Sequence, residues 1–214
     1  THLAITLIRH RLHHMYGGRL KYRVIGEPED LAGATELARN DPYQFQWWVL
    51  GKLDARPAEE KKGPDRGIDG RLYFHDEAVG AKSKLILFSV KAGHLTVSYV
   101  RDLVGTMQRE NANIGVFVSL EEPTREMRRE AAAAGFYTSP AIQTKHARIQ
   151  LLTVNEILDG KGVDYPLPQG NVTFRRAQRV RERDPAENLD MFDGEPARVL
   201  AEPARAVPPR NRRR

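Results

Sequence analysis

Two short stretches of the chain carry residues whose types and spacing suit phosphodiester chemistry. Asp69 lies in GIDG at the start of an expected strand, and Lys91 ends the apolar stretch FSVK. The two residues are close enough in sequence for one hairpin to bring them together. An aspartate can bind a divalent cation that activates a water, and an ammonium can stabilise the charge that develops on the phosphate. The pair therefore predicts a metal-dependent nuclease site.

The strand that ends at Lys91 adds two further candidates. Ser89 and Lys91 are two apart on a strand, so their side chains share one face. The main-chain carbonyl of Val90 is an oxygen ligand that a hard cation accepts, which makes Asp69 and Val90 the expected ligands of Mg²⁺, or of Mn²⁺. Taken singly, an aspartate between glycines is usually a turn residue and a lysine at a strand end is usually a solvated charge.

Basic residues flank these positions on loops and strand ends, and they could clamp a DNA backbone. Such contacts would give sequence-independent, salt-sensitive affinity, although loop lysines are ordinarily only solvated. The expected DNA-binding residues are Lys61, Lys62, Arg66, Arg71, Lys82 and Lys84.

The remaining pattern predicts the elements that would position this site. Period-two alternation or apolar runs predict strands at 68–75, 85–90, 114–120 and 148–154. Helical spacing or capping signals predict helices at 3–15, 31–39, 42–52, 96–109 and 122–134, and a short one that ends at Gly160. In this order they predict an α/β fold with a central mixed sheet flanked by helices.

Capping signals sharpen several of these boundaries. For the helix at 42–52, Asp41 is the predicted N-cap and Pro42 the first-turn proline, and Gln44 could complete a capping box. Thr153 and Glu156 form the same motif before the last short helix. The first helix carries Leu3, Leu7, Ile8, Leu12 and Met15 at helical spacing, so it needs a surface on which to bury them.

The amino-acid composition limits the class of protein and its division into domains. The chain has no cysteine and a net charge of +6. Residues 171–214 contain eleven arginines and no lysine against seven acidic residues, a net charge of +4, so the rest of the chain, at +2, is close to neutral. No run of about 18 apolar residues appears, which predicts a soluble, cytoplasmic protein without a membrane partner. We expect a helical extension at 1–40, a folded domain at 41–165 and a largely disordered Pro/Arg-rich tail at 166–214.

Several of these motifs, in the same order, resemble the Mrr-type restriction endonuclease domain of the PD-(D/E)xK nucleases. The resemblance rests on YQFQ at 43–46, the stretch from Gly63 to Asp69, the VK that ends at Lys91, VRDLVG at 100–105 and GVFVSLEEPTREMRREAAAAGF at 115–136. It implies a restriction-endonuclease-like fold in which Asp69 binds the metal and Lys91 is the catalytic lysine.

This chain departs from the family pattern at two positions. The family usually has Glu or Gln where this chain has Ser89, and it often has Glu in the first helix, where this chain has Gln46. Neutral oxygens can accept metal-bound waters but supply no charge, so metal affinity should fall. Gln46 and Ser89 thus join Asp69 and Lys91 as the expected catalytic set, in weakened auxiliary roles.

A wider resemblance reaches the N-terminal stretch. THLAITLIRHRL, DPYQFQWW, GIDGRLYFHDE and TVNEILDGKGVDYP together resemble the C-terminal region of some bacterial DNA adenine methyltransferases. Two functions follow, and a purely protein-interaction domain, which only the nearly neutral charge of the folded part favours, is a third. The first is a DNA endonuclease of a restriction-modification system, a homo-oligomer if it cuts both strands. The second is a catalytically degenerate module that binds double-stranded DNA beside a methyltransferase.

Several other residues could take part in the chemistry or bind DNA, but most of them have a simpler structural explanation. His10, His13 and His14 suit a solvated helix face better than a metal site, because no acidic ligand accompanies them. His94 is a conceivable proton donor, and Glu110 a conceivable stand-in for the missing carboxylate. Trp47 and Trp48 are adjacent on a helix, so we expect one in the core and the other partly exposed.

Overall fold

The computed structural model describes residues 1–17, 19–58, 67–76, 83–166 and 173. The rest of the predicted tail lies outside the described residues, as do Lys61, Lys62, Arg66 and Lys82.

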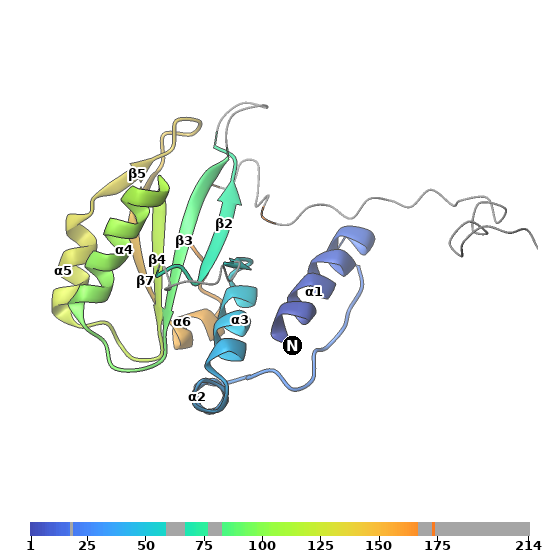
Figure 1. Ribbon diagram of the computed structural model, residues 1–214. Helices are drawn as coiled ribbons and strands as arrows, with labels where there is room; N and C mark the ends of the chain where they lie inside the picture. Colours follow the sequence, from blue (N-terminus) through green and yellow to red (C-terminus); the bar gives the residue numbers. More distant parts are fainter. Residues whose placement is uncertain (18, 59–66, 77–82, 167–172, 174–214) are drawn as a thin grey trace, which may run out of the picture. The chain divides into compact units, whose positions relative to one another are not determined.

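A five-stranded mixed sheet forms the centre of the fold (Figure 1). Its strands are β1 (Arg56–Pro57), β2 (Gly70–Phe74), β3 (Lys84–Lys91), β4 (Ile114–Ser119) and β7 (Ile149–Thr153), in the order β1-β2-β3-β4-β7. β2 pairs antiparallel with β1 and β3, whereas β3, β4 and β7 are parallel. All six residues of β4 are buried, as expected for a parallel strand covered on both faces. The mixed α/β architecture expected from the sequence is confirmed.

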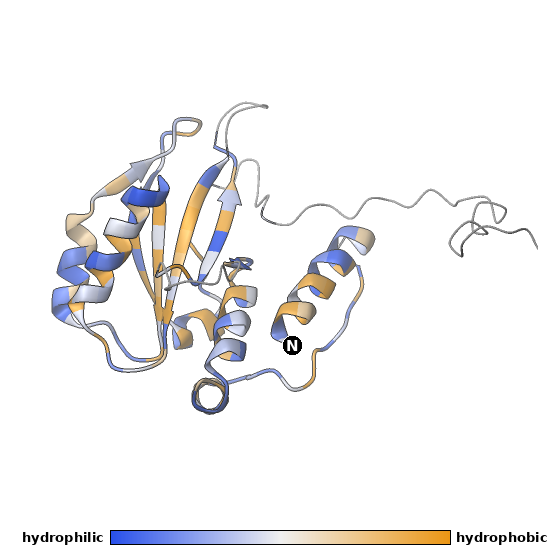
Figure 2. Ribbon diagram, viewed as in Figure 1, coloured by the Kyte–Doolittle hydropathy of each residue, from blue (hydrophilic) through white to orange (hydrophobic). Residues whose placement is uncertain are grey.

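Helices cover both faces of the sheet (Figure 1). On one face, α4 (Val97–Glu110) and α5 (Arg125–Ala133) enclose a core that includes Leu87 and Phe117. On the other, α2 (Leu31–Asn40), α3 (Pro42–Lys52) and α6 (Val154–Leu158) enclose a core that includes Phe88 and Val118. Successive β3 residues thus serve opposite cores, and the apolar colouring of the strands in Figure 2 follows from this double burial.

Side-chain caps set the starts of several helices. Asp41 accepts a hydrogen bond from the Gln44 amide at 3.0 Å, as the sequence predicted. The predicted capping box at Thr153 and Glu156 is complete. The box expected at Gln44 is wrong, because its side-chain oxygen accepts from the main-chain amide of His2 at 2.9 Å instead. Gln44 therefore ties the first helix to α3 rather than closing its own helix.

The first helix, α1 (His2–Tyr16), ends at Gly17, whose φ of 59° is the left-handed conformation that glycine adopts readily. Its packing differs from the expected burial of an apolar stripe. The buried residue is Thr6, which lies against Gly51 of α3 so closely that a side chain at Gly51 would collide with it. Leu7, Ile8 and Met15 remain exposed.

Three short strands escaped the sequence patterns. β1 begins where a loop was expected, and β5 (Phe136–Thr138) and β6 (Lys145–Ala147) form a separate antiparallel pair. Buried Asp76 holds this pair, because Tyr137 and Ser139 each donate a hydroxyl hydrogen bond of 2.5 Å to its carboxylate. Strands this short have too little periodicity to be recognised from sequence alone. Among the described residues, no helix is long and apolar enough to cross a membrane.

Candidate active site

The β2–β3 hairpin brings Asp69 next to Lys91. Gly70 pairs with Phe88, and the Asp69 amide continues the ladder by donating to the Phe88 carbonyl at 2.9 Å. β2 is antiparallel to β3 and begins where β3 ends. Asp69 and Lys91 therefore lie at the same end of these two neighbouring strands. Lys91 Nζ is 3.7 Å from Asp69 Oδ2. The expected convergence of these two residues is therefore present.

Protein donors already hold both oxygens of the Asp69 carboxylate. Gln46 of α3 donates its side-chain amide to Oδ1 at 2.6 Å. The main-chain amide of Val90 donates to Oδ2 at 2.7 Å. With the Lys91 ammonium beside Oδ2, the carboxylate is compensated in charge and in hydrogen bonds without any external cation.

Lys91 is also fixed from its other side. Its ammonium lies 5.9 Å from the centroid of the Tyr99 ring, within the range of a cation–π contact. Tyr99 belongs to the first turn of α4 and stacks on Phe117 of β4, with ring centroids 6.3 Å apart. Sequence reasoning missed Tyr99, and no signal in the sequence links it to Lys91, because only the α4 crossover places that helix over the end of β3. Lys91 still keeps 35% of its side-chain surface exposed.

Ser89 of β3 lies on the sheet face that α4 covers, next to Asp69 and Lys91. It is two residues before Lys91 and two after Leu87, which packs under α4, so all three project toward the α4 side. Only 6% of Ser89 is exposed. The predicted shared face of Ser89 and Lys91 is thus the face beneath α4.

The donor set does not fit a divalent metal ion. Asp69 supplies one carboxylate, and Gln46 and Ser89 add no charge. Within the described part of the chain, no three His, Cys, Asp or Glu side chains are grouped to hold a metal. Glu110, considered as a stand-in, instead binds Arg71 at 3.2 Å. A hard cation prefers several charged oxygen ligands. This site offers a single carboxylate, and both of its oxygens already accept hydrogen bonds from the protein.

Two of the expected DNA-contacting residues, Arg71 and Lys84, lie in the described part of the chain. Arg71 is committed to Glu110. Lys84 begins β3 while Lys91 ends it, so the two lie roughly 23 Å apart along the strand.

The other candidates occupy ordinary positions. His10 Nε2 lies 3.4 Å from Asp54, whereas His13 and His14 are exposed near the end of α1. His94 is exposed in the turn between β3 and α4 and, among the described residues, makes no bond that would hold it at the site. Trp48 is buried and Trp47 only partly, as predicted.

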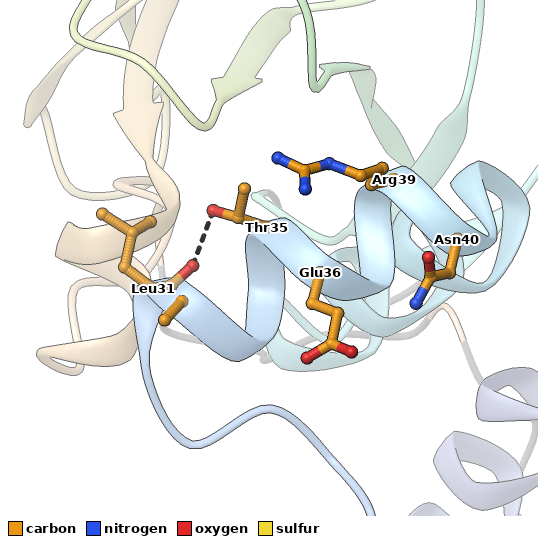
Figure 3. Close-up of a pocket in the computed structure, with 6 residues that line it drawn as sticks. Leu31, Thr35, Glu36, Arg39 and Asn40 are labelled. Atoms are coloured by element: carbon orange, nitrogen blue, oxygen red, sulfur yellow. Dashed lines mark hydrogen bonds between the residues drawn. The ribbon is translucent and has the colours of Figure 1, made fainter.

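A hollow on the described surface lies away from this cluster. It is a shallow depression of about 640 Å³ on the outer side of α2, lined only by residues of that helix (Figure 3). Thr35 donates there to the Leu31 carbonyl, and Glu36, Arg39 and Asn40 line the rest. A hollow on one helix that lacks walls from other elements does not define a ligand site.

A mixed sheet with helices on both faces, and an aspartate and a lysine that meet at one edge of a central hairpin, define a restriction-endonuclease-like domain. The family described as NACHT-associated inactive Restriction Endonuclease 1 matches residues 42–159, and the chain belongs to this family. The match spans the segment from α3 to α6, which contains Gln46, Asp69, Ser89 and Lys91.

One solved structure is similar to part of the chain. MspJI restriction endonuclease in complex with a 27-mer oligonucleotide matches with a TM-score of 0.42 and 16% sequence identity. The match covers 66% of this chain and 33% of that one, so this chain spans about a third of its length. No curated protein matches the chain.

Proposed function

We propose that this chain is a nuclease-fold module that binds duplex DNA without cutting it. The observation that carries the proposal is that the protein itself satisfies the Asp69 carboxylate. This carboxylate accepts hydrogen bonds from Gln46 and Val90, and the Lys91 ammonium lies beside it. Phosphodiester hydrolysis by this type of site needs a metal that activates water and balances the developing charge. A single, already compensated carboxylate binds such a metal poorly. The family's description as inactive supports the same conclusion.

Two features at the site support contact with a phosphate. The Lys91 ammonium is partly exposed, and it lies beside the first turn of α4. At the start of that helix, Thr96 makes no side-chain capping bond, so a phosphate at the positive end of the helix dipole could take the place of the missing cap. The arginine-rich residues 171–214 would add sequence-independent attraction to a polyanion.

A metal-dependent DNA endonuclease is the second candidate. It is favoured by the 3.7 Å approach of Lys91 to Asp69, the one part of the catalytic pattern that this chain keeps. Mg²⁺ or Mn²⁺ would then be held by Asp69 and the Val90 carbonyl, with the remaining ligands from water or from the DNA. The narrower Mrr-type assignment, a methyltransferase partner and a homo-oligomer all remain predictions.

Cleavage and binding assays on one set of proteins decide between the two candidates. Methylated and unmethylated duplexes are incubated with the wild type, Asp69→Ala and Lys91→Ala in Mg²⁺ or Mn²⁺, and binding is followed by fluorescence anisotropy. We expect no cutting, and weaker binding by Lys91→Ala because its phosphate contact is lost. Arg128→Ala is the matched control, since it removes a cation of α5 that is paired with Glu122. Metal-dependent cutting that Asp69→Ala abolishes would instead establish the endonuclease.

A further inference from the structure

Exposed apolar side chains concentrate in residues 1–26. They lie on α1 and on the segment that follows it, which makes this segment unlike the rest of the described surface. The exposed fractions reach 53% for Ile8, 67% for Met15 and 90% for Ile25. The full set is Leu7, Ile8, Met15, Tyr16, Leu20, Tyr22 and Ile25.

The apolar stripe of α1 faces outward because polar contacts attach the helix on its other side. The His2 amide donates to Gln44, Thr6 lies against Gly51, and Arg9 binds Glu27 at 2.7 Å. At 100° per residue, Ile8 and Met15 lie opposite Thr6, and Leu7 lies about 100° from it on the flank of the same exposed side. The helix therefore keeps unburied the face that would ordinarily anchor it.

The same segment has only one sign of charge. Residues 1–26 contain no Asp or Glu and five Arg or Lys residues. Arg9 and Arg23 are paired with Glu27 and Glu29. Arg11, Arg19 and Lys21 are exposed, and they have no ion-pair partner within the described part of the chain. Arg11 lies within the apolar stripe, between Leu7 and Met15 in the helical sequence.

From this surface we infer that α1 and residues 19–25 form a docking site for an acidic amphipathic helix of a partner protein. Apolar residues of the partner helix cover Leu7, Ile8 and Met15, and its flanking carboxylates face Arg11 and the cations after Gly17. Met, Tyr and Arg, the residue types enriched at protein interfaces, make up much of the surface. The surface lies outside residues 42–159, so none of its residues belongs to the family match or to the Asp69 cluster.

The charge pattern also separates this partner from other occupants. A second copy of the chain would place Arg11 and its neighbours against cations of the same kind, which opposes association. Duplex DNA would satisfy the cations but leave the apolar stripe in water. A lipid surface would have to receive Arg11 in the middle of the inserted face, where charge is costly.

The test uses the full chain and a labelled helical peptide that carries leucines on one face and glutamates beside them. Binding is measured by fluorescence anisotropy, with a twin peptide in which lysines replace the glutamates. We expect the acidic peptide alone to bind, and the Ile8→Asp/Met15→Asp variant to lose about tenfold or more in affinity through lost apolar contact and repulsion. Ile142→Asp is the matched control, because Ile142 is also an exposed apolar residue, at 45%, and lies between β5 and β6 rather than on α1.

Several outcomes would overturn the inference. These are absence of binding, equal binding of both peptides, and equal affinities of Ile8→Asp/Met15→Asp and Ile142→Asp. Sedimentation showing a wild-type dimer that Ile8→Asp/Met15→Asp dissolves would assign the surface to a second copy. Binding to phosphatidylserine vesicles but not to the acidic peptide would assign it to lipid. Circular dichroism confirms that both variants are folded, and unchanged duplex binding keeps the result independent of the Asp69 site.

Discussion

At the scale of single residues, two neutral side chains decide how the site behaves. Gln46 donates a hydrogen bond to Asp69, where an acid would instead repel it until a cation arrived. Ser89 fills a buried position beneath α4 without adding charge. Lys91 therefore balances the negative charge of Asp69, and no excess negative charge remains for a metal ion to neutralise.

Returning acids to these positions should make the protein respond to metal. We expect Gln46→Glu/Ser89→Glu to unfold at a lower temperature than the wild type without metal, because three carboxylates then crowd together. Mg²⁺ or Mn²⁺ should raise the unfolding temperature of this variant and leave that of the wild type unchanged, as differential scanning fluorimetry would record. Ser89→Gln controls for side-chain size without charge. An equal metal response in the wild type would contradict this account of Asp69.

The turn into β2 depends on one residue without a side chain. A Cβ at Gly70 would collide with the Leu50 side chain and approach the Arg56 carbonyl to 3.3 Å. We expect Gly70→Ala to lower the free energy of unfolding by about 1–3 kcal/mol, the usual cost of overpacking. Chemical denaturation measures this, with Gly93→Ala as the control, because a Cβ there meets nothing within 4 Å. Equal stabilities would show that Leu50 moves aside without cost.

At the scale of elements, α1 is attached by polar contacts, and one of its groups titrates. Burial lowers the pKa of His2 from its ordinary 6.5, and the carboxylate of Glu27 opposes this only in part. The attached helix thus favours neutral His2, so its attachment is strongest above pH 6.5 and weakens as the pH falls below that value.

Hydrogen exchange of α1 amides should report this weakening. After correction for the intrinsic pH dependence of exchange, we expect protection of α1 to fall between pH 7.5 and 5.5, while that of β4 stays constant. His2→Gln should remove most of the pH dependence, whereas His14→Gln, at an exposed position, should keep it. A wild-type profile without this fall would mean that His2 stays neutral or is solvated throughout.

At the scale of the whole molecule, the charge is divided between a nearly neutral folded part and an arginine-rich C-terminal stretch. Thr173 lies at the boundary, because its hydroxyl accepts from the Tyr73 amide of β2 at 2.8 Å. A truncation that tests the stretch must therefore keep Thr173.

Removal of residues 174–214 should weaken nonspecific duplex binding and flatten its dependence on salt. The truncation deletes eleven arginines, each able to displace counterions from the phosphate backbone. Affinities measured by anisotropy across a salt series give the slope, and replacement of the stretch by an uncharged linker of equal length is the control. An unchanged slope would show that these arginines do not contact DNA.

The sequence by itself determined the order of the main elements, because their signals are local. Apolar runs marked β3, β4 and β7, and capping residues such as Asp41 and Thr153 placed helix starts, since hydrogen bonds to nearby amides need no distant partner. The pairing of Asp69 with Lys91 was also predictable, because a hairpin between adjacent strands leaves few alternatives.

Only the tertiary structure decided what those residues do together. The Gln46 bond to Asp69 and the Tyr99 contact with Lys91 join elements that the chain brings together by crossovers, so their distances are invisible in sequence. The outward turn of the apolar stripe on α1 was likewise unpredictable. Helical spacing shows that a stripe exists, but which side packs depends on the surface the helix meets, and here polar contacts to α3 and Glu27 decided it.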